Sequence, residues 1–190
     1  ADAQAAINAS DATPYTIAQV SKPAFMDSKD NAWMWGIVIA ETDRVVTSGI
    51  VNWPSHMGSL NYGYANFSGG HQINKALFNS IPATDVRKGW WIDENCESPN
   101  LDEEQAWFMK DYCGYVPYTH CKFAPYANEV YTSTNANDIP LMRIEEMYLI
   151  KAEAEAMAGN AAAGKATLET FVQTYRNPEY TCAAASAQEI

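Results

Sequence analysis

Basic residues are scarce in this chain, and the few present are scattered. The 190 residues include 12 Lys and Arg against 23 Asp and Glu, which gives a net charge of −11. The longest basic cluster is the dipeptide Arg87-Lys88. Binding to nucleic acid depends on clustered positive charge that displaces counterions from the phosphates. The composition therefore excludes nucleic acid as a main partner.

A long apolar run is also missing. The longest strongly apolar stretch extends from Trp33 to Ala40, whereas a membrane-spanning helix needs about 20 apolar residues. The first residues, Ala1 to Gln4, lack the basic start and the apolar stretch of a signal peptide. We expect no transmembrane helix, and either a cytosolic protein or a chain that begins after a removed segment.

The motifs of common catalytic sites are absent. The sequence contains no G-x-S-x-G, no P-loop and no H-E-x-x-H. His56, His71 and His120 are the only histidines, and none lies near another recognisable element. We interpret each as a surface or hydrogen-bonded histidine, and we expect no catalytic residue, metal or cofactor. A pair of catalytic carboxylates for glycoside hydrolysis is neither identified nor excluded by the sequence, because the distance between the two groups depends on the fold.

An acidic segment, Asp93 to Glu104, has oxygen-bearing side chains at several positions of an EF-hand loop. The glycine that makes the sharp turn of such a loop is replaced by Ser98, and Pro99 follows it. We therefore interpret the segment as a solvated acidic loop, with a loosely built calcium site as the alternative.

The four cysteines are few and widely spaced. No C-x-x-C pair occurs, so a structural zinc site is not expected. Two alternatives are open: four free thiols, or one disulfide, either Cys113–Cys121 or Cys96–Cys113.

Apolar and aromatic residues are plentiful. Hydrophobic residues make up 47% of the chain, and the aromatics comprise 6 Trp, 11 Tyr and 6 Phe. A disordered chain lacks this much apolar surface, so a packed core is expected. The length suits one domain or part of a larger one.

Elements in the first part of the chain are short. The spacing of apolar residues, together with the proline and glycine residues that end helices, predicts three short helices. Two stretches rich in β-branched and aromatic residues, or with partial alternation, predict strands. The helices are expected at Ala3–Ala9, His71–Ile81 and Asp102–Tyr112, the strands at Trp33–Ala40 and Val116–Pro125, and a loop at Asn52–Gly70.

The region after Asn137 carries the clearest pattern. Asp138 and Pro140 are typical of a helix start, and Gly159 and Asn160 mark the end of one helix and the cap of the next. We therefore predict an antiparallel hairpin of helices 138–158 and 160–176, similar in length to a tetratricopeptide unit. Ser186 and Glu189 form a capping-box pattern, which predicts the start of a truncated helix at 186–190.

The aromatic residues of the Asn52–Gly70 loop are the candidate ligand contacts. Exposed rings stack on the apolar face of a sugar, while neighbouring amides and carboxylates bind its hydroxyls. The alternative is that these rings anchor the loop to the core. In the adjacent pair Trp90-Trp91, at most one ring can face the same core. The candidate residues are Trp53, Tyr62, Tyr64, Asn61 and Asn66, with Trp90 and Trp91 in reserve.

The run from Asp138 to Ala154, DIPLMRIEEMYLIKAEA, resembles the SusD/RagB family of nutrient-binding outer-membrane lipoproteins. The segment IPATDVRKGWW from Ile81 resembles the Asp-x-Arg segment of the family. The pair Lys122-Phe123 and the segment FVQTYRNP from Phe171 are similar to later family segments. These matches occur in family order over about residues 80 to 180.

The resemblance implies a mainly α, SusD-like fold of tetratricopeptide-like hairpins with long loops and a few short strands. It further implies capture of oligosaccharide or another nutrient rather than catalysis. A TonB-dependent transporter is the implied partner, and the implied location is the outer-membrane surface, reached through a lipid anchor absent from this chain. We expect residues 1–190 to be one SusD-like fragment: a loop-rich ligand side at 1–137, the hairpin at 138–178 and the truncated helix at 186–190.

Two alternative functions remain open at the level of sequence. A helical-repeat module that binds only protein would also explain the Ala-rich hairpin. A glycoside hydrolase would use the same aromatics with two carboxylates. If the chain is a fragment, apolar residues should be exposed on the outer face of the hairpin, in a patch of more than about 400 Å².

Overall fold

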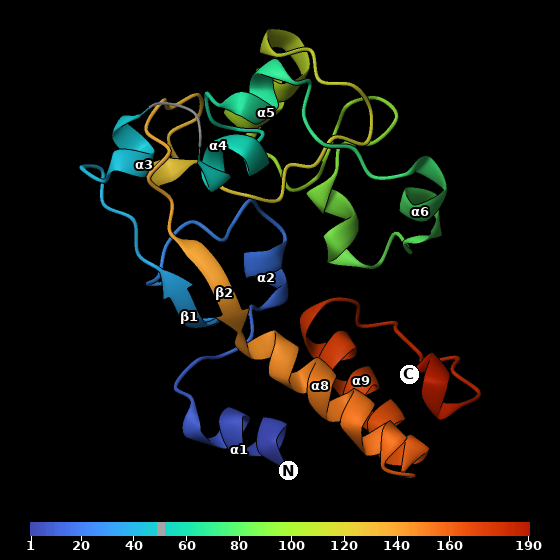
Figure 1. Ribbon diagram of the computed structural model, residues 1–190. Coiled ribbons are helices and arrows are strands. Elements are labelled where there is room, and N and C mark those ends of the chain that lie inside the picture. Colours follow the sequence, from blue (N-terminus) through green and yellow to red (C-terminus); the bar gives the residue numbers. More distant parts are fainter. Residues whose placement is uncertain (49–51) are drawn as a thin grey trace.

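The structure, a computed structural model, describes residues 1–48 and 52–190 and is built mainly from helices (Figure 1). The longer helices are α1 (Asp2–Ala9), α8 (Ile144–Met157) and α9 (Ala161–Tyr175). Strands β1 (Trp33–Ile37) and β2 (Ile139–Arg143) pair with each other. The remaining helices are α2 (Ile17–Val20), α3 (Arg44–Thr47), α4 (Trp53–Met57), α5 (Tyr64–Phe67), α6 (Lys75–Ser80) and α7 (Glu103–Trp107). The predicted mainly α fold with long loops and few short strands is confirmed.

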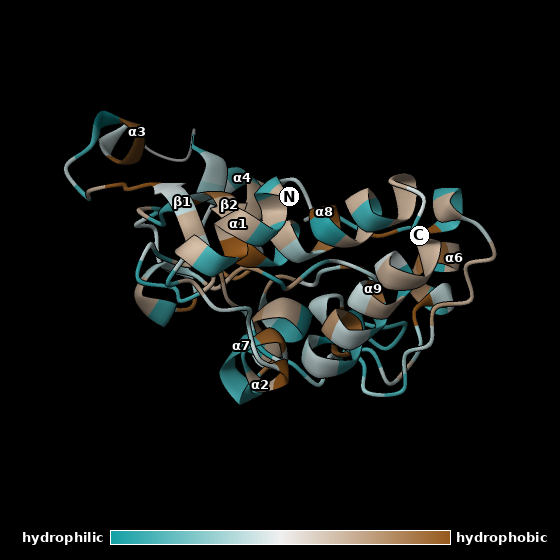
Figure 2. Ribbon diagram, turned by 90° about the horizontal axis from the view of Figure 1, so that it is seen from below, coloured by the Kyte–Doolittle hydropathy of each residue, from teal (hydrophilic) through white to brown (hydrophobic). Residues whose placement is uncertain are grey.

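Helices α8 and α9 form the expected hairpin and lie side by side in both views (Figures 1 and 2). Gly159 makes the turn with a φ of 92°, a conformation that favours glycine. Asn160 caps α9 by accepting a hydrogen bond from the Ala163 N–H at 3.1 Å. Because these signals are local, the sequence was sufficient to predict them.

The first helix of the hairpin starts later than predicted. Residues 139–143 form β2, which pairs antiparallel with β1, with Ile37 opposite Ile139. Asp138 does not cap α8, because its carboxylate accepts hydrogen bonds from the N–H groups of Ser28 (2.8 Å) and Ile39 (2.7 Å). The prediction of helix over 138–143 is therefore wrong: pairing with a distant strand outweighs the local helix signal.

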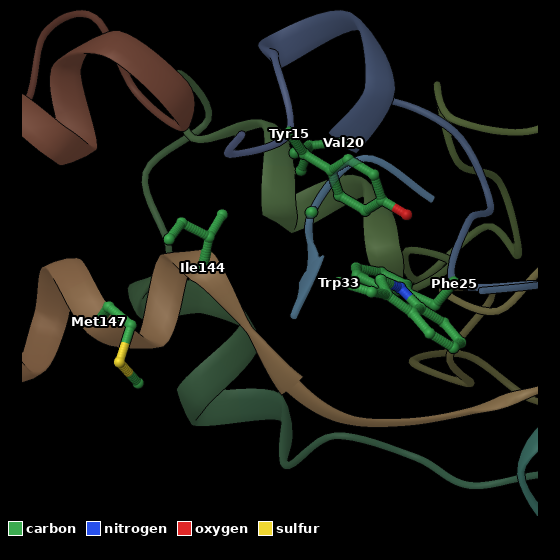
Figure 3. Close-up of a cluster of buried hydrophobic side chains, with 7 residues drawn as sticks. Tyr15, Val20, Phe25, Trp33, Ile144 and Met147 are labelled. Atoms are coloured by element: carbon green, nitrogen blue, oxygen red, sulfur yellow. The ribbon is translucent and has the colours of Figure 1, made fainter. Parts of the chain in front are cut away.

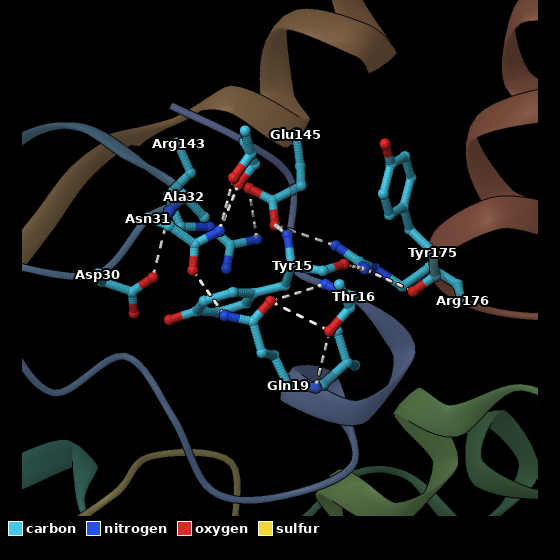
Figure 4. Close-up of polar contacts among 12 residues, drawn as sticks. Tyr15, Thr16, Gln19, Asp30, Asn31, Ala32, Arg143, Glu145, Tyr175 and Arg176 are labelled. Atoms are coloured by element: carbon cyan, nitrogen blue, oxygen red, sulfur yellow. Dashed lines mark hydrogen bonds and ion pairs between the residues drawn. The ribbon is translucent and has the colours of Figure 1, made fainter. Parts of the chain in front are cut away.

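The strand-to-helix junction also decides which acid Arg143 meets. Arg143 and Glu146 are three residues apart, a spacing that favours an ion pair only where both residues lie on one helix. Arg143 lies outside α8, however, and its Nη2 is 3.6 Å from Glu145 Oε2, while Glu146 is exposed (Figure 4). Asp85 and Arg87 form an ion pair with a shortest distance of 2.6 Å.

One hydrophobic core lies where the sheet meets the start of α8. Figure 3 shows its side chains converging from the N-terminal segment, β1 and α8. Its buried members are Tyr15, Val20, Phe25, Ala32, Trp33, Ile144 and Met147. This core fixes the loop-rich region to the helical part of the molecule.

A second core supports the loop-rich region itself. Its buried members are Leu60, Ile92, Phe108, Met109, Tyr115 and Cys121. Tyr115 also donates a hydrogen bond from its hydroxyl to the Ser59 carbonyl at 3.0 Å. The long connections over 52–131 are therefore packed against a core of their own, as expected for functional loops.

Three predicted elements of this region differ in the structure. The stretch 52–70 contains α4 and α5 rather than continuous loop, and Asn52 caps α4 through the Ser55 N–H. The helix predicted from His71 begins only at Lys75, because Asn74 caps it. The strand predicted at 116–125 is wrong: Thr119, His120 and Phe123 form only isolated bridges to separate segments.

The remaining predictions for the chain ends and surface have mixed outcomes. The helix near Ala3–Ala9 is confirmed as α1. Residues 187–189 form one 3₁₀ turn in which Ser186 makes no capping bond, so the predicted capping box is wrong. No helix in the described ranges is long and apolar enough to span a bilayer. On α8, Leu149, Ile150 and Met157 are exposed.

Candidate functional site

A group of aromatic rings, here called the aromatic cluster, lies over the second core. Its members are Tyr62, Phe67, Trp107, Tyr112 and Tyr131. Neighbouring ring centroids are 5.0 to 5.5 Å apart, so the rings form one continuous chain from Phe67 to Trp107. Phe67, Trp107, Tyr112 and Tyr131 are exposed, and Tyr62 is half-buried. The cluster thus presents a broad aromatic surface to solvent.

Backbone hydrogen bonds hold Tyr131 beside Tyr62. The Tyr131 N–H donates to the Leu60 carbonyl (2.8 Å), and the Tyr62 N–H donates to the Thr132 carbonyl (2.9 Å). Tyr131 has a φ of 63°, which is uncommon for a bulky residue. Strained backbone of this kind often occurs where a side chain must be held in a functional position.

A short π-helical turn positions Trp107 and Tyr112. Asp102 and Gln105 form a reciprocal capping box at the start of α7, and the π turn Phe108–Tyr112 follows directly. Phe108 and Met109 are buried beneath the surface. On a regular α-helix, residues five apart lie on different faces, but i→i+5 bonding brings Trp107 and Tyr112 together. Their centroids are 5.5 Å apart.

The tyrosine hydroxyl groups of the cluster can form hydrogen bonds with a ligand that stacks on the rings. The rings of Tyr131 and Tyr112 are in contact, and the neighbouring Tyr112 side chain raises the pKa of Tyr131 to about 12. The tyrosine is therefore neutral at physiological pH. A surface of aromatic faces and neutral hydroxyls can stack on an apolar ligand face and exchange hydrogen bonds at its edge.

Tyr62 is the predicted site residue that the structure places in the cluster. Tyr64 is also exposed, but its ring stacks on His56 with a centroid distance of 4.5 Å. Trp53 is half-buried and packs edge-on against Phe123 at 5.1 Å. The structure does not bring Trp53, Tyr62 and Tyr64 into one aromatic surface.

The two predicted amide partners have structural contacts. Asn61 is 2% exposed and donates from Nδ2 to the Pro54 carbonyl (3.3 Å) and to Asn135 Oδ1. Its assignment as a sugar contact is therefore wrong, because its side chain lies inside the protein. Asn66 is half-buried and donates to Cys113 Sγ at 2.8 Å, which ties α5 to the end of the π turn.

The rings of the reserve pair, Trp90 and Trp91, contact each other, with 6.3 Å between their centroids. Trp90 donates from Nε1 to the Val20 carbonyl at 3.0 Å, and the Lys122 ammonium lies 4.6 Å from its ring centroid. Burial lowers the pKa of Lys122 to about 8. Trp90 and Trp91 line the same cavity, but the indole N–H of Trp90 is hydrogen-bonded within the protein.

Trp107, Tyr112 and Tyr131 were not found as candidates from the sequence. Trp107 and Tyr112 meet only because of the π turn, which has no clear sequence signal. Tyr131 comes from a segment 69 positions beyond Tyr62, with a backbone conformation set by the contact to Leu60. Phe67 lay in the recognised aromatic loop and could have been included.

The sequence left two questions open: whether the acidic segment binds calcium, and whether the cysteines form a disulfide. Across 1–48 and 52–190, no group of three or more His, Cys, Asp or Glu side chains is arranged to hold a metal ion. Asp93, in the acidic segment, instead accepts hydrogen bonds from the N–H groups of Asn95 (2.8 Å) and Glu97 (3.0 Å). The four cysteines are free thiols, so neither alternative disulfide is formed.

Comparison with known proteins identifies the family. A sequence model described as the SusD family matches residues 54–186, which is well over half of the chain. The chain belongs to the SusD family. A search of curated proteins found no significant match to this SusD-family chain.

The fold agrees with this family membership. The structure is similar to that of a SusD-like carbohydrate binding protein from Bacteroides vulgatus ATCC 8482, with a TM-score of 0.59 and 17% sequence identity. The similarity covers 98% of this chain and 34% of that protein. The SusD-family chain therefore spans about a third of the length of that solved structure.

Proposed function

We propose that this chain binds oligosaccharide at the cell surface and that the aromatic cluster is its binding surface. The observation that carries the proposal is the continuous row of rings from Phe67 to Trp107, of which four are exposed and Tyr62 is half-buried, supported from below by a packed core. Aromatic rings bind the apolar faces of pyranoses, and the tyrosine hydroxyls can bind sugar hydroxyls. Membership of the SusD family and the carbohydrate-binding solved relative support the same ligand class.

Binding rather than hydrolysis is the activity we infer. None of the five cluster residues is a carboxylate or a histidine, so the rings bring no acid or base of their own to a bound sugar. The further proposal, carried by the family resemblance, is delivery of the glycan to a TonB-dependent transporter. The protein would then act on the outer-membrane surface.

The experiment compares sugar binding by two aromatic variants. Isothermal titration with maltohexaose, cellohexaose, xylohexaose and mannohexaose first identifies an oligosaccharide that binds. The double variant Tyr112→Ala/Tyr131→Ala should then bind it at least about tenfold more weakly, because two stacking rings are lost. The matched control is Trp35→Ala, which removes a ring that is 63% exposed on β1, outside the cluster.

The outcomes separate the competing functions. Unchanged binding by the double variant, or equal loss in the control, would show that the cluster is not the binding surface. Absence of binding to any glycan, together with capture of a protein partner, would favour the interaction module. Release of reducing sugar that is lost when one carboxylate is mutated would favour a hydrolase.

A further inference from the structure

A cavity of about 640 Å³ lies between α6, the 3₁₀ turn Val86–Trp90 and the segment that follows α9. It shares no residue with the aromatic cluster, and Figure 1 shows α6 well apart from α5. Its volume lies in the usual range of small-ligand sites. The apolar and aromatic walls are formed by Ile73, Leu77, Ile81, Pro82, Trp90, Trp91 and Tyr180.

Three side-chain hydrogen-bond donors of the residues that line this cavity have no protein acceptor within the part of the chain that the structure describes. Asn177 is 3% exposed, and its Oδ1 accepts the Glu179 N–H at 3.1 Å, which leaves Nδ2 unpartnered. Arg87 uses Nε and Nη2 to bind Asp85, which leaves Nη1. Trp91 Nε1 is the third, in contrast to the bonded indole of Trp90. A ligand with acceptor oxygens could therefore bind these donors.

The charges in the cavity favour an uncharged ligand. Arg87 and Asp85 are its only charged lining residues, and they pair with each other at 2.6 Å. An anionic ligand would have to compete with Asp85 for the guanidinium and approach a chain of net charge −11. A cation would find no unpaired carboxylate in the lining. Apolar walls, unpartnered donors and a neutral pair together fit a pyranose, which has apolar faces and many hydroxyl oxygens.

We propose that this cavity is a second site for a neutral sugar, with Trp91 as the stacking ring and Asn177 and Arg87 as donors to its hydroxyls. The ligand class rests on the proposed function, but the site is separate from the aromatic cluster. Two sites on one chain would hold two stretches of the same polysaccharide, and binding would then strengthen with polymer length without any new contact.

Indole N–H signals in a ¹H–¹⁵N correlation spectrum test both sites in one titration. Trp107 reports on the aromatic cluster and Trp91 on the cavity, while Trp35, which is exposed on β1 and lines neither site, serves as an internal control. Substitution by Phe, one tryptophan at a time, assigns each signal. The probes are maltotriose, cellotriose, xylotriose and mannotriose, added to the folded chain.

We expect at least one trisaccharide to shift the signals of both Trp107 and Trp91, but not that of Trp35. Movement of Trp107 alone would overturn the second site and leave the proposed function standing. Movement of Trp91 alone would retain the cavity and overturn the aromatic cluster. If neither signal moves with any probe, both proposals are wrong.

A conservative variant tests the donor role of Asn177. Asn177→Asp keeps an oxygen for the Glu179 N–H but removes the Nδ2 donor. The titration followed at Trp91 should weaken about fivefold, which corresponds to the loss of one hydrogen bond, while that followed at Trp107 stays unchanged. An unchanged Trp91 titration would overturn the assignment of Asn177, and thermal melting of the variant verifies that it is folded.

Discussion

Glu145 at the start of α8 and Arg176 at the end of α9 form a buried ion pair, with 3.1 Å between Glu145 Oε1 and Arg176 Nη2 (Figure 4). Both side chains are only 4% exposed. The pair also holds the backbone of Tyr15: Glu145 accepts the Tyr15 N–H, and Arg176 donates to the Tyr15 carbonyl, each at 3.1 Å. One pair thus joins both hairpin helices to the N-terminal segment.

Removal of the Glu145 charge should strongly destabilise the fold. In Glu145→Ala the Arg176 guanidinium stays buried without its partner, so the free energy of unfolding should fall by about 3 to 5 kcal/mol. Urea unfolding measures this change. The exposed neighbour provides the control, since Glu146→Ala should change stability by no more than about 0.5 kcal/mol. Equal effects of the two substitutions would contradict the role assigned to the pair.

The interface between α8 and α9 has no room for an added methyl group at Gly164. A Cβ on Gly164 would lie 2.5 Å from the Ala152 carbonyl oxygen and 2.9 Å from Ala156 Cβ. Although alanine favours helix over glycine by about 1 kcal/mol, we expect Gly164→Ala to lower the melting temperature. Ala162→Ser, at an exposed position of the same helix, is the control. An increase in the melting temperature of Gly164→Ala would show that the helices can separate at no cost.

Acid should weaken the fold through His120. Burial lowers the pKa of His120 to about 4, from an ordinary value near 6.5. The unfolded chain then binds more protons than the folded one between these pH values, so this contribution to stability is lost as the pH falls from 6.5 to 4. Burial raises the pKa of Asp30 to about 6, which acts in the opposite direction.

The variant His120→Gln separates the effect of His120 on acid stability from that of Asp30. Urea unfolding between pH 7 and 4 should show a smaller loss of stability on acidification for His120→Gln than for the unmodified chain. His56→Gln, at an exposed position, should keep the full pH dependence. Identical pH dependence in all three proteins would exclude His120 as its origin.

The effect of Tyr112 on Tyr131 within the aromatic cluster can be measured by titration. Because the neighbouring Tyr112 side chain raises the pKa of Tyr131 to about 12, Tyr112→Phe should lower the pKa of Tyr131 toward its usual value near 10. Carbon-13 chemical shifts of labelled tyrosine between pH 8 and 12 follow this ionisation. Tyr64→Phe is the control, because Tyr64 lies outside the cluster and stacks on His56. A Tyr131 pKa that does not respond to Tyr112→Phe would disprove this effect.

The sequence was sufficient wherever the determining signals are local. The turn at Gly159, the cap at Asn160 and the start of a helix at Asp102 were each predicted from neighbouring residues. The start of α8 was not, because β2 depends on a strand about 100 positions earlier. In the same way, Glu145 pairs with Arg176 from another helix, and no local spacing indicates that pair.

In the candidate site, too, the features set by neighbouring residues were predicted and those set by distant contacts were not. The aromatic loop was recognised, and Tyr62 is part of the exposed cluster. Asn61 was misassigned because its burial depends on Asn135, far along the chain. Trp107 and Tyr112 are brought together by a π turn, and Tyr131 is placed by its backbone bond to Leu60. Such juxtapositions follow from the tertiary structure and not from residue spacing.

The most direct test of the central claim is a crystal structure of the chain soaked with the oligosaccharide that binds most tightly. We expect a sugar ring stacked on Trp107, Tyr112 or Tyr131, with tyrosine hydroxyls bound to its oxygens. A bound sugar that contacts none of the five residues of the aromatic cluster would contradict the account.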